Sequence, residues 1–153
     1  MLLRAKASCF ADACDLALGA PADQILDGYL ELVPDSDPMR NGFHPHVVSA
    51  VLLDKFMIGL TQIDLIPTGQ SDDELGSMDT FTDRLVSWFA RPDFRCVVTG
   101  PKVDGGEEHA LAFNGGTFID PALPGPVTIE EPNINIRTLW LLTLPPAVGE
   151  VPS

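Results

Sequence analysis

Three residues of this sequence, Cys9, His109 and Asp120, have the side-chain types that nucleophilic attack on a carbonyl group requires. A thiolate attacks the carbonyl carbon, and an imidazole takes the thiol proton and later gives it to the leaving group. A carboxylate behind the imidazole fixes its tautomer and orientation. Because the three residues are far apart along the chain, this chemistry depends on the elements that carry them.

Cys9 opens a predicted helix over residues 9–18. The apolar stripe of this helix consists of Phe10, Ala13, Cys14 and Ala17, which recur at helical spacing. Ser8 has the residue type of an N-cap, and Gly19 has the type that ends a helix. Cys9 would then lie in the first helical turn, where unpaired backbone N–H groups favour a thiolate.

His109 and Asp120 flank a predicted hairpin. Residues 109–113 alternate in the manner of a strand, the Asn-Gly-Gly of residues 114–116 suits a tight turn, and residues 117–120 form a second short strand. Each of the two polar residues lies four or five positions from the turn. The sequence therefore predicts that the imidazole and the carboxylate lie at the same open end of two paired strands, within hydrogen-bond reach.

The rest of the chain separates into a helical half and a strand half. Further helices are predicted over residues 20–33, 43–59 and 79–92, and further strands over residues 61–69, 95–100 and 133–144, with a loop at 33–42 and an acidic linker at 71–78. Helices followed by an antiparallel sheet define the α+β class. The length of 153 residues favours one domain. We expect a single domain over residues 1–145 and a flexible Pro-rich tail over residues 146–153.

The composition narrows the choice of partners. Nine Lys plus Arg against 22 Asp plus Glu give a net charge of −13, which repels nucleic-acid phosphates and anionic lipids. The sequence therefore predicts binding to neither nucleic acid nor membrane, and it favours a protein or peptide partner of basic character. No apolar run reaches the roughly 18 residues of a membrane span, and charges interrupt the N-terminal segment where a signal peptide is apolar. We expect a cytoplasmic protein; nothing in the composition specifies an oligomeric state.

Other residues with reactive side chains are assigned structural roles. Cys14 falls on the apolar stripe and Cys96 alternates with valines in a strand, so both are predicted to be core residues. Three cysteines make an odd set, which argues against a disulfide framework. His44 and His46 resemble a metal pair, but Pro45 separates them and no third ligand is near in the sequence, which favours a role at a helix entry. The sequence thus predicts no metal and no cofactor.

Each of the three reactive residues also has a purely structural interpretation. Cys9 can be read as a small apolar residue in a helix, and His109 as a polar strand residue beside an acidic loop. Asp120 precedes Pro121, a pair that often ends a strand and starts a turn. The pairing of His109 with Asp120 across the hairpin is what favours the catalytic interpretation.

Three segments resemble a known family. The first is Cys9 followed by Ala11, Ala13 and Leu18-Gly19, the second is the segment GFHPHVVSAVL, and the third is the hairpin HALAFNGGTFIDP. They are similar to segments of the small papain-like cysteine peptidase fold of bacteriocin-processing peptidases, which cleave double-glycine leaders. They are also similar to those of its free-standing phage and bacterial relatives. The resemblance covers roughly residues 8 to 143. It implies a papain-like fold in which Cys9 is the nucleophile, His109 the general base and acid, and Asp120 its orienter. The implied activity is hydrolysis of a peptide or isopeptide bond through an acyl-enzyme.

Two departures from that family pattern keep alternatives open. The bacteriocin-processing peptidases usually carry a Gln shortly before the Cys, whereas residues 1–8 contain none, and Phe10 stands where Gly is frequent. Loss of one oxyanion donor typically costs about a hundredfold to a thousandfold in rate. A second hypothesis is therefore a catalytically inactive papain-like protein, a phage or accessory factor, that binds a protein partner through an acidic surface. A third is acyl transfer to an amine, which uses the same three residue types.

Overall fold

The computed structural model describes residues 6–64, 95–104, 107–122 and 125–143 of the chain. Within them the elements follow in the order η1 (Lys6–Ser8), α1 (Cys9–Leu18), α2 (Ala22–Leu32), α3 (Pro38–Asn41), α4 (Pro45–Phe56), β1 (Gly59–Asp64), β2 (Arg95–Pro101), β3 (Glu108–Asn114), β4 (Thr117–Asp120), β5 (Val127–Ile129) and β6 (Thr138–Thr143). N-terminal helices thus precede an antiparallel sheet, which confirms the α+β prediction.

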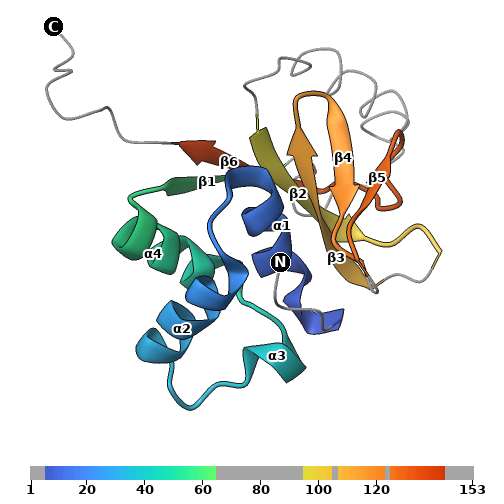
Figure 1. Ribbon diagram of the computed structural model, residues 1–153. Helices are drawn as coiled ribbons and strands as arrows, with labels where there is room; N and C mark the ends of the chain where they lie inside the picture. Colours follow the sequence, from blue (N-terminus) through green and yellow to red (C-terminus); the bar gives the residue numbers. More distant parts are fainter. Residues whose placement is uncertain (1–5, 65–94, 105–106, 123–124, 144–153) are drawn as a thin grey trace, which may run out of the picture.

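The sheet has the strand order β1-β6-β2-β3-β4-β5, and each neighbouring pair is antiparallel. The helix α1 packs against β2 and β3 at the middle of this order, while α2 packs against α4 further from the strands (Figure 1). As a result α1 covers the central strands, while α4 contacts the edge strand β1.

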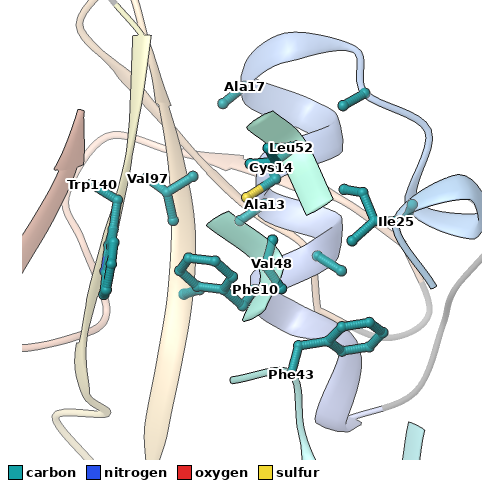
Figure 2. Packing of buried hydrophobic residues seen from close by; sticks show 14 of the residues in the cluster. Phe10, Ala13, Cys14, Ala17, Ile25, Phe43, Val48, Leu52, Val97 and Trp140 are labelled. Atoms are coloured by element: carbon teal, nitrogen blue, oxygen red, sulfur yellow. The ribbon is translucent and has the colours of Figure 1, made fainter. Parts of the chain in front are cut away.

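Small side chains allow α1 to lie close to β3. Ala110 and Ala112 are buried in the same core cluster as Ala13 and Ala17 of α1. Figure 2 shows this layer, with Val97 and Trp140 on the sheet side of α1 and Ile25 on the other side. The alternate residues of β3 belong to a second cluster on the opposite face of the sheet, formed by Cys96, Val98, Leu111, Phe113, Phe118, Ile134, Ile136 and Leu139. The strand alternation of period 2 therefore divides the molecule into two cores.

α1 begins and ends at the residues that the sequence predicts, but the residue before its first turn does not make a capping hydrogen bond. Gly19 ends the helix with φ 74°, and its N–H donates to the Asp15 carbonyl at 2.6 Å, as expected for a glycine in the left-handed region. Ser8 occupies the N-cap position, yet its side chain makes no capping hydrogen bond. Its hydroxyl instead donates to the buried Asp12 carboxylate at 2.8 Å. The expected capping role of Ser8 was therefore wrong.

The histidine pair enters α4, as predicted. His44 is the N-cap of α4, and its Nδ1 accepts from the His46 backbone N–H at 3.3 Å. The His44 N–H donates to the Tyr29 hydroxyl at 3.0 Å, which ties the entry of α4 to α2. Cys14 and Cys96 are both fully buried, which confirms their assignment to the core.

Several boundaries differ from the sequence prediction. The expected loop at 33–42 contains the short helix α3, and β5 was not predicted at all. The strand expected over 133–144 contributes β6 only from Thr138. The predicted linker at 71–78, the helix at 79–92 and the tail at 146–153 lie outside the described residues. In the part of the chain that is described, no helix has the length and apolar character to cross a membrane.

Candidate active site

Cys9 is the first residue of α1, directly after the turn η1. Its side chain is only partly buried, in contrast to Cys14 and Cys96. Burial raises the pKa of the Cys14 thiol far above its ordinary range and raises the pKa of Cys96 to about 12, so these two thiols are unsuited to act as nucleophiles. Cys9 is therefore the one of the three cysteines whose position permits attack on a substrate.

The predicted hairpin is present and sets the spacing of the other two residues. Gly115 and Gly116 form the turn with φ values of 60° and 97°, a conformation that favours glycine at both positions. Across the two strands Ala112 faces Ile119. Following the same register, His109 and Asp120 are diagonal neighbours on one face of the hairpin, which long side chains can bridge.

The structure brings the His109 and Asp120 side chains into direct contact. His109 Nε2 lies 2.6 Å from Asp120 Oδ1, and both residues are less than a tenth exposed. The second oxygen of Asp120, Oδ2, accepts a hydrogen bond from Asn133 Nδ2 at 2.7 Å. Both oxygens of this buried carboxylate are thus occupied, which satisfies the requirement for burying a charge.

The contact between His109 and Asp120 favours the charged form of both side chains. Burial works against an imidazolium, but hydrogen bonds to Asp120 and Cys9, together with the charges of the two, outweigh it and raise the pKa of His109 to about 9. Burial likewise works against the carboxylate, yet hydrogen bonds from His109 and Asn133, with the nearby charges of His109 and Lys102, lower the pKa of Asp120. At neutral pH the site accordingly holds an imidazolium beside a carboxylate.

Cys9 and His109 line the same groove. A side-chain hydrogen bond between Cys9 and His109 is among the causes of the raised pKa of His109. Since Nε2 contacts Asp120, the ring nitrogen left for the thiol is Nδ1. The structure thus brings His109 and Asp120 into contact and places Cys9 and His109 on the lining of one groove.

Cys9 and His109 open into a groove with a volume of about 800 Å³. One wall comes from the chain between α3 and α4 and includes Asn41 and Phe43. The other wall comes from the sheet and includes Lys102 and His109. The volume falls within the range of sites that bind small molecules or short segments of chain. Within the described ranges, no cluster of three or more His, Cys, Asp or Glu side chains could hold a metal ion.

Asn133 is the site residue that sequence reasoning missed. It lies within a segment that the sequence predicts as an uninterrupted strand, and its residue type alone does not indicate a contact with Asp120. The signal that could have found it is the unusual occurrence of two Asn residues, at positions 133 and 135, in a predicted strand, because Asn is depleted in strands.

No family model, curated protein or solved structure compared with the chain matches it. The resemblance to papain-like peptidases rests on residues and spacing alone.

Proposed function

We propose that this protein is a papain-like cysteine hydrolase that cleaves a peptide or isopeptide bond. The observation that carries the proposal is the buried His109 ring, which hydrogen-bonds Asp120 and lines the same groove as Cys9. This is the arrangement that an activated thiol nucleophile requires. The α+β order, with the Cys at the start of a helix and the His on the central sheet, fits the same proposal.

In the proposed reaction the Cys9 thiolate forms a bond to the substrate carbonyl carbon, and the carbonyl π electrons move to oxygen. The oxyanion then re-forms the carbonyl and expels the amine, which takes a proton from the His109 imidazolium. The thioester that results is opened by water, whose proton returns to His109. Asp120 stays ionised throughout and holds the ring in place.

The oxyanion needs a donor, and residues 1–8 contain no Gln to supply it. The groove wall opposite His109 offers the side chain of Asn41 at the end of α3, a helix that packs against η1 immediately before Cys9. The backbone N–H groups of Asn41 and Gly42 already donate to Asp37 and Pro38. We therefore propose the side-chain amide of Asn41 as the neutral donor on this side of the groove.

The experiment is a peptide-cleavage assay with matched variants. A mixture of synthetic peptides of basic, neutral and acidic composition, with one Lys-branched isopeptide, is incubated with wild type, Cys9→Ser and His109→Ala. Mass spectrometry should find new termini in the wild-type reaction alone, with basic peptides cleaved first because of the net charge of −13. Addition of methylamine separates hydrolysis from acyl transfer, because transfer gives methylamide products. No cleavage and no transfer by the wild type would contradict the proposal.

A second candidate function is that of a silent papain-like protein that binds a protein partner. The absence of a Gln before Cys9 favours it, because the loss of an oxyanion donor can abolish useful turnover. Such a protein would bind a basic peptide from the mixture equally well as wild type and as Cys9→Ser, and would leave that peptide intact.

A further inference from the structure

Asp120 has a second partner that the triad chemistry does not require. Asn133 Nδ2 lies 2.7 Å from Asp120 Oδ2, while Asp120 Oδ1 lies 2.6 Å from His109 Nε2. A carboxylate held by one donor can turn about its terminal torsion, which is broad and two-fold. With a donor on each oxygen, the plane of the carboxylate is fixed.

The segment that follows Asn133 contains a β-bulge. Between the pairs Thr99–Thr138 and Lys102–Ile134, β2 contributes two residues and the facing segment contributes three. One extra residue on one strand defines a bulge. It lies opposite Gly100, where an added Cβ would come within 1.8 Å of the Asn135 carbonyl oxygen. Only glycine leaves room for so close an approach of two backbones.

The bulge changes which face of the sheet each residue occupies. Ile134 and Ile136 belong to the same buried cluster as Leu139, although an unbroken strand would place even and odd positions on opposite faces. Asn133 directly precedes Ile134 and lies outside the paired strands. The Val103 N–H donates to the Asn133 carbonyl at 3.1 Å and anchors the backbone there.

We propose that Asn133 is a positioning residue that fixes the Asp120 carboxylate and through it the orientation of His109 toward Cys9. The proposal rests on the proposed function for its catalytic meaning, but the contact itself can be tested without any activity.

An amide suits this position for a chemical reason. The Nδ2 group can only donate and carries no ionisable proton, so it stabilises the carboxylate without competing for the proton on His109. The other charged groups that act on Asp120 are His109 from β3 and Lys102 from the end of β2. A carboxylate in place of Asn133 would instead repel Asp120.

The test compares Asn133→Leu, which keeps the size but removes the donor, with Asn135→Ala as a control on the same segment. The Asp120 carboxyl is titrated by NMR, and the rate of Cys9 alkylation by iodoacetamide is measured at pH 7. Asn133→Leu should raise the pKa of Asp120 and slow alkylation about tenfold to a hundredfold, the factor that a hydrogen bond to a charged group represents. Asn135→Ala should change neither quantity.

An Asp120 titration that is unchanged in Asn133→Leu would overturn the proposal, even if alkylation slowed, since a slower reaction alone would mean a general structural defect. Asn133→Asp provides a second variant, because it keeps the size of the side chain but replaces the donor by a carboxylate, and it should raise the pKa of Asp120 in the same direction. If wild-type Cys9 reacts like an ordinary thiol, the proposed function fails, whereas the Asp120 titration still decides whether Asn133 holds the carboxylate.

Discussion

At the scale of single residues, the chemistry depends most on what surrounds His109. Its ring is buried, which would normally favour the neutral imidazole, yet two partners on opposite ring nitrogens reverse that preference. Asp120 supplies a negative charge at 2.6 Å from Nε2, so Nδ1 is the ring nitrogen left for another partner. The same carboxylate therefore sets both the protonation state and the orientation of the imidazole.

Asp120→Asn should remove the charge that holds His109 in its imidazolium form. The pKa of His109, raised to about 9 in the wild type, is expected to fall toward its ordinary value near 6.5. Titration of the imidazole ring signals by NMR measures this directly. A His109 pKa that stays near 9 in Asp120→Asn would mean that Asp120 is not the cause of the shift.

Asn41→Ala tests the oxyanion donor separately from the nucleophile. Acylation by p-nitrophenyl acetate passes through an oxyanion, whereas alkylation by iodoacetamide does not. We expect acylation of Cys9 to slow about a hundredfold to a thousandfold, with alkylation unchanged. Arg40→Ala, in which the neighbouring groove residue is truncated, is the control. Equal acylation rates in Asn41→Ala and wild type would exclude Asn41 as the donor.

At the scale of elements, the helix and the hairpin could be predicted because their signals are local. The Asn-Gly-Gly turn of residues 114–116 fixes the strand spacing, and the apolar stripe over 9–18 fixes the helix. The bulge at 133–137 could not be predicted, because it arises from the pairing of two strands distant in sequence. Consequently the contact of His109 with Asp120 could be predicted from the sequence, and the contact of Asn133 with Asp120 could not.

Gly100→Ala should destabilise the protein, because the new methyl group meets a backbone carbonyl at 1.8 Å and the bulge must move. The free energy of unfolding is expected to fall by about 1–3 kcal/mol, the usual cost of overpacking. Gly125→Ala is the matched control, since nothing lies within 4 Å of its added Cβ. Chemical denaturation of the two variants measures the difference, and equal stability would contradict the close approach at Gly100.

At the scale of the whole molecule, the active-site pair links stability to pH. Because folding raises the pKa of His109 to about 9, the folded state binds a proton more tightly than the unfolded chain. This difference in proton binding stabilises the folded state. The stabilisation is complete below about pH 6.5, the ordinary pKa of His, and it is lost as the pH rises to about 9. Asp120, whose pKa is lowered, contributes above its ordinary value and loses that contribution as the pH falls through its folded-state pKa.

Urea denaturation of the wild type should therefore give a free energy of unfolding that declines between pH 6.5 and 9. His109→Gln should show a flatter profile over the same interval, because it lacks the titrating group. Parallel profiles for the two proteins would place the pH dependence elsewhere in the molecule.

The α+β fold class could also be predicted, because the periodicity of apolar residues indicates the order of helices and strands along the chain. The strand order could not, because β1 joins the sheet beside β6, a strand far along the chain. The short elements α3 and β5 escaped prediction for a related reason. Each is three or four residues long and depends on packing against η1 or pairing with β4.

The most direct test of the catalytic assignment is the rate of Cys9 alkylation by iodoacetamide from pH 5 to 9, in wild type and in His109→Ala, with Cys9→Ser as the control for Cys14 and Cys96. An ion pair between Cys9 and His109 predicts fast alkylation that persists below pH 7 in the wild type and is lost in His109→Ala. A slow reaction that rises with the titration of an ordinary thiol, identical in both proteins, would contradict the assignment of Cys9 and His109 as a catalytic pair.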